Sequence, residues 1–344
     1  MVNHQEKMRK IGVGIIGLRF GLSHLQAYME NPQVEVMGIC DLDDKRLGEV
    51  KAKYGVKVAV TDYRDLLKQK DIDAVSVVTP DHFHVEHSVA AMRAGKHVLC
   101  EKPMAPTVEE CEQIIRTSDE TDMKFMVGQV CRFTPNFILT KELISKGTIG
   151  ELFFVESEYA HNYRRALGVG GWRKDPKIGR EPFLGGACHA VDLVRWMADE
   201  VEEAFAYRNH RALPDWPRDD CTIAIFKFRN GVIGKVFCSI GCYRPYTMRS
   251  VFYGTKGTII SDNTSPHIWL FLGEMEDMLL DFIIIPVKLT GKNIKGEVDT
   301  FVDCVINEKP VELDGREGAR TVATCIAAIE SARKGKPVQV KTIK

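Results

Sequence analysis

The chain has 344 residues, enough for two domains that each bury a core without help from metals or disulfides. Lys plus Arg and Asp plus Glu both number 47, and this zero net charge gives no indication of a nucleic-acid or membrane-surface partner. The ten cysteines lack the short paired spacings of zinc ribbons and redox motifs, which favours reduced thiols in a cytoplasmic protein.

The first 130 residues alternate short apolar runs with longer segments of helical period. This is the pattern of a parallel sheet covered by helices. Residues 1–130 are therefore predicted to form a doubly wound, Rossmann-type α/β domain. We expect strands at 11–16, 34–40, 74–78, 96–100 and 125–128, and helices at 23–30, 44–53, 85–94 and 108–121.

The pattern changes after residue 130, where a helix at 135–146 leads into long β-like runs joined by turn signals. Residues 131–344 are predicted to form an α+β domain with a large, mostly antiparallel open sheet that binds substrate and supports oligomerisation. A capping-box pattern opens a final helix at 315–333, whose packing partner the sequence leaves open. The expected strands lie at 152–159, 201–208, 222–229, 232–239, 249–253 and 258–261.

Two further segments bear on location. The polar N-terminal residues predict no signal peptide. The most apolar later stretch, 278–287, is interrupted by Asp281 and Pro286 and is far shorter than the roughly 20 residues of a membrane span. We expect it to be a buried strand or loop.

The turn after the first predicted strand has the features of a dinucleotide site. Ligands of an open parallel sheet bind outside the carboxyl ends of its strands. Gly17, Arg19, Phe20 and Gly21 follow the first strand, and Asp41 ends the second, where an acid would accept hydrogen bonds from ribose hydroxyls. The turn lacks the middle glycine of GxGxxG, so a turn without a ligand, with Asp41 only capping a helix, is the alternative.

The segments VVTPDHFH at 77–84 and AGKHVLCEKP at 94–103 resemble the Gfo/Idh/MocA family of NAD(P)-dependent oxidoreductases. Later landmarks include GTIGE at 147–151, GWR at 171–173 and HAVDLVRW at 189–196, so the resemblance covers nearly the whole chain. It implies an NAD-dependent dehydrogenase acting on CH–OH groups, a sugar-like or polyol substrate, and a homodimer or homotetramer.

The resemblance also implies roles for residues of the first domain. Lys102 matches the lysine that contacts both the nicotinamide ribose and the reacting oxygen of the substrate, and Glu101 is its cofactor-side neighbour. Thr79, Pro80 and His84 match the loop that lines the cofactor. Gln129, after the fifth strand, completes the set of candidate cofactor residues.

For the second domain the resemblance assigns His189 as acid/base, with Asp192 three residues later and Arg132 facing the substrate. The chemistry suits these residue types, because oxidation of a secondary alcohol needs a base at the hydroxyl and a cation to stabilise the alkoxide. Tyr163 and Trp172, with the neighbouring Arg164 and Arg165, are predicted to stack on a sugar; interdomain packing is the alternative.

One departure from the family concerns the acid of its DxxxH motif. The residue four before His189 is Gly185, so the usual partner of the histidine is missing. Asp175, Glu181 or Asp192 are candidate substitutes.

Two other interpretations carry little weight. His82, His84 and His87 are not accompanied by an open set of carboxylates, so we expect no metal. Cys188, beside His189, fits a packing cysteine better than a catalytic thiol.

The leading hypothesis is hydride transfer between NAD and a secondary hydroxyl carbon of a sugar, cyclitol, sugar acid or glycoside. Asp41 favours NAD over NADP, because a carboxylate repels a 2′-phosphate. The alternatives are a glycosidase that retains NAD and oxidises its sugar transiently, and a non-catalytic NAD-binding sensor. Substrate choice is expected to lie in loops 162–177 and 243–248.

Overall fold

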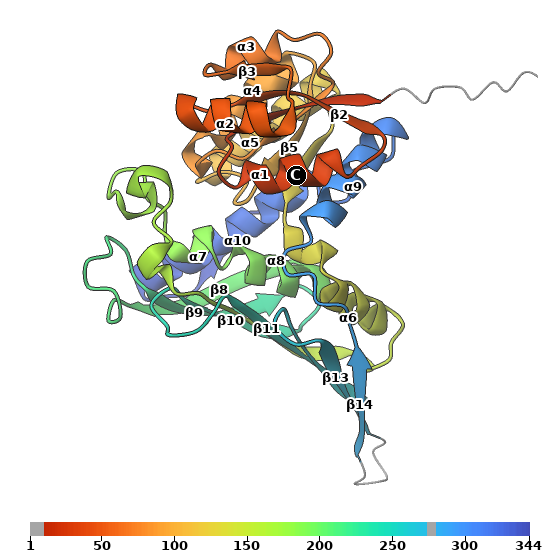
Figure 1. The fold of residues 1–344 in the computed structure, drawn as a ribbon. Coiled ribbons are helices and arrows are strands. Elements are labelled where there is room, and N and C mark those ends of the chain that lie inside the picture. Colours follow the sequence, from red (N-terminus) through yellow and green to blue (C-terminus); the bar gives the residue numbers. More distant parts are fainter. Residues whose placement is uncertain (1–9, 274–279) are drawn as a thin grey trace, which may run out of the picture. The chain divides into compact units, whose positions relative to one another are not determined.

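The computed structural model describes residues 10–273 and 280–344, which divide into two compact units (Figure 1). Unit 1 contains the described residues up to Ala105, together with Glu109–Gly128 and Ile294–Gly315. Unit 2 contains Pro106–Val108, the described residues of Gln129–Asn293, and Arg316–Lys344.

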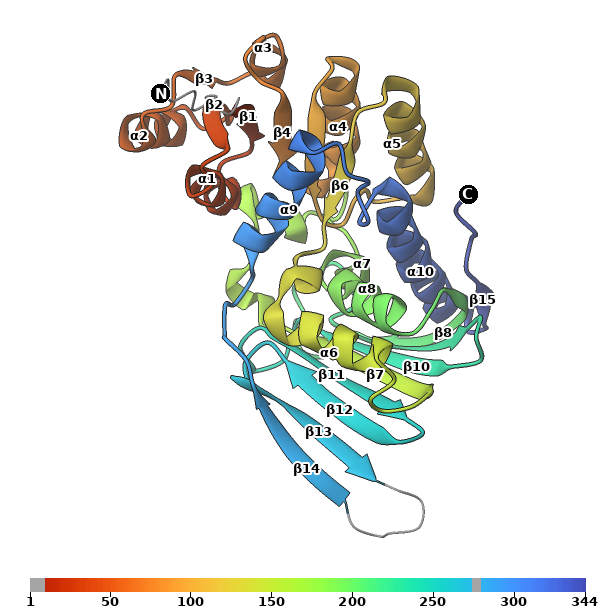
Figure 2. The same cartoon turned by 90° about the vertical axis from the view of Figure 1, so that its right-hand side faces the viewer.

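Within the described residues, unit 1 is built on a six-stranded sheet of order β3-β2-β1-β4-β5-β6 with all neighbours parallel. Figure 2 shows α4 and α5 side by side, as helical crossovers between parallel strands require. The strands are β1 (Ile11–Ile16), β2 (Val34–Cys40), β3 (Val58–Val60), β4 (Ala74–Val77), β5 (His97–Glu101) and β6 (Phe125–Gly128). The helices are α1 (Gly21–Met29), α2 (Asp44–Tyr54), α3 (Tyr63–Leu67), η1 (Asp81–Phe83), α4 (His84–Arg93) and α5 (Val108–Thr121).

This architecture confirms the predicted doubly wound domain. The five expected strands are present because each is a mainly apolar run, and every residue of β1 is buried, whereas Glu35 of β2 is exposed. The sequence missed β3, which has three half-buried residues and lies at the sheet edge. Such a strand is too short to give a periodic signal.

Helix α9 (Ile294–Ile306) also belongs to unit 1, whereas the sequence analysis assigned all residues after 130 to the second domain. It packs on α1, and Asn31 Nδ2 donates to Asp299 Oδ1 at 2.8 Å. Val127 N–H of β6 donates to the Leu313 carbonyl at 3.0 Å, so the segment that follows α9 is also joined to the sheet. A segment distant in sequence therefore completes the core of unit 1.

Unit 2 has a nine-stranded sheet of order β14-β13-β12-β11-β7-β10-β9-β8-β15 within the described residues. The pair β7–β10 is parallel and the other pairs are antiparallel, which confirms the predicted mostly antiparallel sheet. Its strands are β7 (Leu152–Ala160), β8 (Val201–Asn209), β9 (Cys221–Phe228), β10 (Ile233–Ser239), β11 (Thr247–Gly254), β12 (Gly257–Asp262), β13 (His267–Gly273), β14 (Leu280–Pro286) and β15 (Val338–Gln339).

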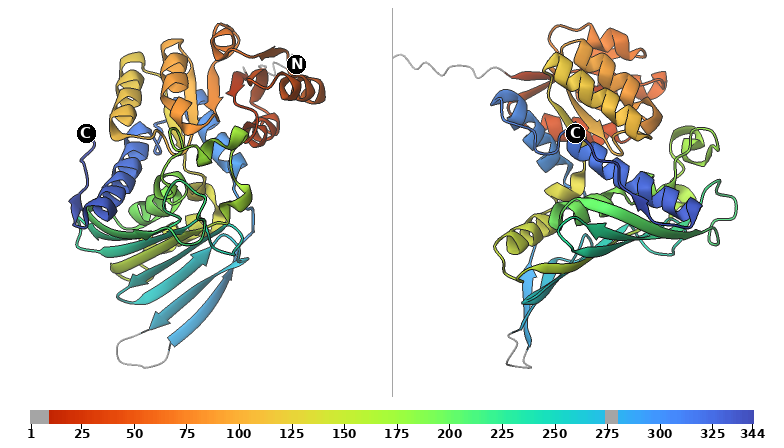
Figure 3. Two further views of the ribbon diagram at one scale, coloured as in Figure 1. Left: turned by 90° about the vertical axis from the view of Figure 1, so that its left-hand side faces the viewer. Right: turned by 180° about the vertical axis from the view of Figure 1, so that it is seen from behind.

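Helices α6, α8 and α10 cover one face of this sheet, as Figures 1 and 3 show. The predicted final helix, α10, packs in unit 2, where Ser331 Oγ accepts from Ala206 N–H of β8 at 3.0 Å. The helical segments of unit 2 are η2 (Val130–Phe133), α6 (Pro135–Ser145), η3 (Tyr163–Arg165), η4 (Val169–Lys174), α7 (Pro182–Gly185), α8 (Cys188–Met197) and α10 (Gly315–Lys334).

The other face of the sheet exposes apolar side chains. Along β9, Ala224 and Phe226 are buried, whereas Ile223 and Ile225 are 37% and 51% exposed. The expectation of a buried strand or loop at 278–287 is wrong for β14, where Phe282, Ile283 and Ile284 are 40–54% exposed, because β14 is the edge strand of the sheet. Residues 278 and 279 lie outside the described residues.

Two further predictions concern the state of the cysteines and the absence of membrane-spanning helices. All ten cysteines lie in the described part of the chain and are free thiols there. Across the described residues, none of the helices combines the length and apolar character that crossing a membrane requires.

Candidate active site

The glycine turn after β1 can form only with glycine at position 17. Gly17 has φ +92°, and a Cβ there would lie 2.7 Å from the Val78 carbonyl oxygen. The next turn residue, Leu18, donates its N–H to Asp41 Oδ2 at 2.7 Å. Asp41 therefore braces the turn from the end of β2.

The alternative role of Asp41 as a helix cap is taken by another residue. Asp43 is the N-cap of α2 and accepts from Arg46 N–H, while Asp41 Oδ1 accepts from Asp43 N–H at 2.9 Å. Helix α1 begins directly after the turn, with no side-chain cap at the exposed Phe20. A helix N-terminus that follows a glycine turn is suited to pyrophosphate, and Arg19 is also exposed beside it.

His84 joins the loop after β4 to the segment after β5. Its Nε2 lies 2.9 Å from the Thr79 carbonyl oxygen and its Nδ1 lies 2.9 Å from the Pro103 carbonyl oxygen. Burial lowers the pKa of His84 more than the Asp81 carboxylate and the two carbonyl contacts raise it. Pro80 follows Thr79 in the loop that His84 holds. His87 Nδ1 lies 3.1 Å from Thr79 Oγ1, so these histidines serve hydrogen bonds within the loop.

A polar cluster that the sequence analysis missed lies behind Lys102. Glu101 Oε2 accepts from the Lys102 N–H at 3.1 Å, and Glu101 Oε1 lies 3.4 Å from His24 Nε2. His24 Nδ1 lies 3.3 Å from Ser76 Oγ. His24, on α1, and Ser76, on β4, are both fully buried, so α1 and β4 together fix the backbone at Lys102.

Glu297 of α9 completes this cluster. Donor atoms of His24, Glu101 and Glu297 lie within 4.8 Å of one another, a spacing that a metal ion could use. The absence of a metal remains a prediction from the sequence. The cluster was missed because α9, which carries Glu297, was not expected to return to this unit.

In unit 2, His189 is buried at the start of α8 and follows two glycines that leave no room for side chains. A Cβ at Gly186 would lie 2.3 Å from the Tyr159 ring. A Cβ at Gly185 would lie 1.9 Å from Arg180 Nε, and Arg180 Nη2 donates to the Gly185 carbonyl at 3.2 Å. Arg180 thus occupies the space that a side chain at position 185 would need.

The three candidate replacements for the missing acid each have other partners. Asp175 Oδ1 accepts from Lys177 N–H at 2.7 Å. Glu181 accepts from Arg333 at 2.6 Å. Asp192 is the most buried of the three and belongs to a larger ion network.

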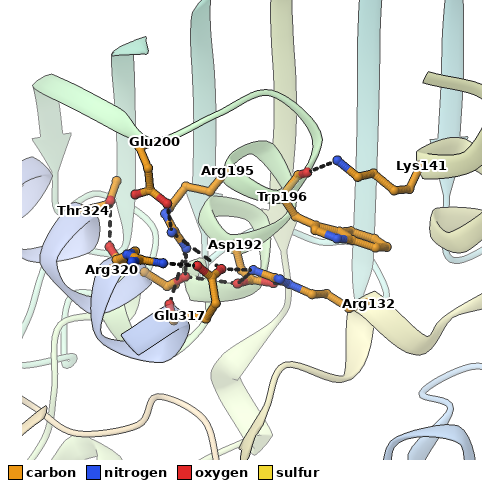
Figure 4. Close-up of polar contacts among 10 residues, drawn as sticks. Arg132, Lys141, Asp192, Arg195, Trp196, Glu200, Glu317, Arg320 and Thr324 are labelled. Carbon is orange, nitrogen blue, oxygen red and sulfur yellow. Dashed lines mark hydrogen bonds and ion pairs between the residues drawn. The ribbon is translucent and has the colours of Figure 1, made fainter. Parts of the chain in front are cut away.

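The ion network links η2, α8 and α10 (Figure 4). Arg132 binds both Asp192 oxygens, at 2.8 and 2.7 Å, and also reaches Glu317 Oε2 at 3.0 Å. Thr321 Oγ1 donates to Asp192 Oδ1 at 3.0 Å. The two predicted substrate residues Arg132 and Asp192 are therefore bound to each other. Three arginines face three carboxylates in this network: Arg132, Arg195 and Arg320 with Asp192, Glu200 and Glu317.

The arginines of the network offset the cost of partly burying Glu317. Burial is the largest single influence on Glu317 and raises its pKa, but Arg195, Arg132 and Arg320 together lower it more, and the net pKa falls. The pKa of Arg132 shifts in the opposite direction. Burial disfavours its charge, but the adjacent Asp192 and Glu317 raise its pKa overall.

The predicted stacking residues lie among other aromatic rings. Tyr163 is 5% exposed, and its hydroxyl lies 2.9 Å from that of Tyr159. The guanidinium of Arg180 lies 4.9 Å from the Trp172 ring centroid. Gln129, which follows β6, is buried. The positions of Tyr163 and Trp172 could be read from the sequence. Their contacts with Tyr159 and Arg180 could not.

The chain is similar to known proteins along most of its length. Residues 11–129 match the family described as "Oxidoreductase family, NAD-binding Rossmann fold". Residues 137–260 match "GFO/IDH/MocA C-terminal domain". The myo-inositol 2-dehydrogenase of Thermotoga maritima is 26% identical over 344 residues, which cover 96% of this chain and 99% of that protein.

Two other similarities differ in extent. A glycosyl hydrolase family 109 protein of Shewanella baltica is 32% identical over 182 residues, but these cover 48% of this chain and 40% of that protein. A levoglucosan dehydrogenase solved in complex with NADH and levoglucosan has a TM-score of 0.88 at 24% identity, covering 97% of this chain and all of that one. The similarity to the levoglucosan dehydrogenase structure shows a shared fold.

Proposed function

Because the chain belongs to the Gfo/Idh/MocA family of NAD-binding oxidoreductases, we propose that it transfers a hydride between NAD and a secondary hydroxyl carbon of a sugar-like substrate. The substrate class is a sugar, cyclitol, sugar acid or glycoside. The observation that carries the proposal is the turn at Gly17, which Asp41 braces and which only glycine can form. This turn opens α1 in the manner that a dinucleotide needs.

The residues of unit 1 fit NAD. The absence of a Cβ at Gly17 lets the turn pack directly against the Val78 carbonyl, and Asp41 is the proposed acceptor for the ribose hydroxyls. When bound, NAD supplies the hydride acceptor or donor. A carboxylate at this position repels a 2′-phosphate, so NAD should bind more tightly than NADP. A lower dissociation constant for NADP would contradict this.

Lys102 and His189 are the proposed catalytic residues. During oxidation the hydroxyl must lose its proton as the hydride leaves, so a neutral imidazole at His189 would accept the proton. The Lys102 ammonium would stabilise the developing alkoxide. Glu101 holds the Lys102 backbone, and Arg132 with Asp192 holds the helix that carries His189.

Of the alternatives, the NAD-retaining glycosidase has limited support. The glycosyl hydrolase relative matches over 40% of its own length, whereas the inositol dehydrogenase matches over 99%. The presence of both Lys102 and His189 weighs against a non-catalytic sensor.

We also propose that a second copy of the chain covers the open face of the sheet of unit 2. That face exposes apolar side chains across several strands, including Phe153, Ile225 and Ile233 at 51–54% exposure. Exposed patches of this kind mark interaction surfaces. A homodimer or homotetramer follows, and sedimentation equilibrium would detect it. A cytoplasmic location remains a prediction of the sequence.

The function is tested with inositols, hexoses, sugar acids and glycosides, following NADH formation by absorbance. We expect NADH to accumulate in proportion to an oxidised polyol. Glycoside cleavage without net NADH would instead support the glycosidase, and NAD binding without turnover on any compound would support the sensor.

A further inference from the structure

A small pocket of unit 2 lies where the last residues of the chain run past α10 and the turn after β9. Its volume is about 190 Å³. Its walls include Glu200 and Arg229, which flank β8 and β9, and Arg320 of α10. Lys341 and Thr342 close it from the C-terminal segment, which is held by the Val340 N–H donating to the Glu202 carbonyl at 2.9 Å.

The charged side chains of the pocket are mostly cationic. Arg229, Arg320 and Lys341 face one carboxylate, that of Glu200. Glu200 is itself bound by Arg195 at 2.6 Å, and Arg195 is almost fully buried outside the pocket. Glu200 is thus paired with Arg195, and Arg320 is likewise paired with Glu317, so the positive excess of the pocket lining comes from Arg229 and Lys341.

The two guanidinium groups also offer donors in a fixed geometry. Each carries five N–H groups. Arg229 Nη2 donates to Thr342 Oγ1 at 3.3 Å, and Arg320 Nη1 donates to Glu317 Oε1 at 2.6 Å. These two bonds hold each side chain in place while using one N–H of its five. Guanidinium groups held in this way suit bidentate contacts with an oxyanion.

We propose that this pocket is a binding site for a phosphate group, distinct from the proposed NAD site. The size supports a small anion, because about 190 Å³ would hold roughly six waters at the approximately 30 Å³ each occupies in the liquid. A phosphate with part of its hydration shell fits that space, whereas a dinucleotide does not. The anion is either inorganic phosphate or the phosphate group of a small ester.

The pocket shares two residues with the ion network, as Figure 4 shows, with Glu200 and Arg320 at one end and Arg132 at the other. Arg320 binds Glu317, which binds Arg132, which binds Asp192. A phosphate that binds Arg320 would use N–H groups other than the one that donates to Glu317 Oε1, so one guanidinium would join the anion to the network. Occupation of the pocket is therefore coupled to the residues that hold helix α8.

The test is isothermal titration calorimetry of the intact chain with inorganic phosphate, in a buffer whose ionic strength is kept constant with chloride. A second titration uses glycerol 3-phosphate. The variants are Arg229→Gln and the double variant Arg229→Gln with Lys341→Gln. Lys227→Gln is the matched control, because it removes an exposed cation of β9 that lies outside the pocket.

We expect saturable binding of one anion per chain, weakened about tenfold by Arg229→Gln, as loss of a charge-assisted contact implies, and little changed by Lys227→Gln. Tighter binding of glycerol 3-phosphate would identify an ester as the ligand, and tighter binding of inorganic phosphate the free ion. Absence of saturable heat with both anions would overturn the proposal, as would equal affinity in the double variant and the control. The measurement needs no polyol or NAD, so its failure leaves the proposed hydride transfer untouched.

Discussion

Units 1 and 2 each hold one proposed catalytic residue, but by different means. In unit 1 the backbone of Lys102 is held at close range by the adjacent Glu101 and, through it, by His24. In unit 2 the helix carrying His189 is held by an ion network that begins one turn later, at Asp192. A substitution in unit 1 should therefore act mainly on rate, whereas one in the network of unit 2 should act first on stability.

The largest expected effect is on turnover. Lys102→Ala should lower kcat by about 10²-fold or more, because the ammonium stabilises charge that develops in the transition state, while the affinity for NAD stays within a fewfold. Steady-state kinetics and cofactor titration measure the two separately. Lys68→Ala, at an exposed lysine of the same unit, is the control. Unchanged kcat would remove Lys102 from the mechanism.

His189→Gln should cost about 10²-fold in alcohol oxidation, within the usual range for loss of a general base. In the parent protein, kcat should rise with pH as His189 loses its proton, and this step should vanish in the variant. Cys188→Ala is the matched control and should keep the parent pH profile. If His189→Gln keeps the same profile, another base such as Tyr163 is required.

The next effect concerns stability. Arg132→Met should destabilise unit 2 by about 3–5 kcal/mol, because it leaves the buried Asp192 carboxylate without its bidentate partner. Arg320→Met removes an arginine at the exposed rim of the same network and should cost less than about 1 kcal/mol. Chemical denaturation measures both. Equal losses would show that burial does not govern the strength of these pairs.

Gly185→Ala should cost about 1–3 kcal/mol, because the new Cβ displaces the Arg180 side chain from its place against Trp172. Gly48→Ala is the control, since a Cβ there meets nothing within 4 Å and glycine is unfavourable inside a helix. It should be neutral or stabilising. Unchanged stability of Gly185→Ala would show that the Arg180 side chain moves aside without cost.

The smallest effect is on the pH dependence of stability. Burial lowers the pKa of His87 to about 4, from about 6.5 in an unfolded chain. Between these values the unfolded state binds more protons, so stability rises with pH from about 4 to 6.5. His87→Gln should reduce that slope by up to about one proton. Urea titrations across this range measure the slope, and an unchanged slope would show that folding does not lower the pKa of His87.

The elements that sequence patterns predicted well are those whose partners lie nearby in the chain. Strands such as β1 and β2 are continuous apolar runs separated by helices, and the turn at Gly17 follows directly from the first. Helix α9 has a regular apolar period, with Val298, Phe301 and Val302 buried, but its packing on α1 depends on a partner more than 250 residues away.

The candidate site shows the same limit. Asp192 was predicted to bind substrate because it lies one turn from His189, and its contact with Arg132, 60 residues earlier, has no local signature. The missing acid at position 185 was visible in the sequence, but the reason for it was not. In the structure the side chain of Arg180, 5 residues earlier in the chain, fills the space above Gly185.

The central claim, hydride transfer from a hydroxyl-bearing carbon to NAD, is tested most directly by isotope transfer. The best polyol of the substrate panel is prepared with deuterium on the oxidised carbon, and the reduced cofactor is analysed by mass spectrometry. One deuterium per reduced cofactor, with the rate lost in Lys102→Ala, is the predicted result. Reduced cofactor without deuterium, or product formed with no reduced cofactor, would contradict the account.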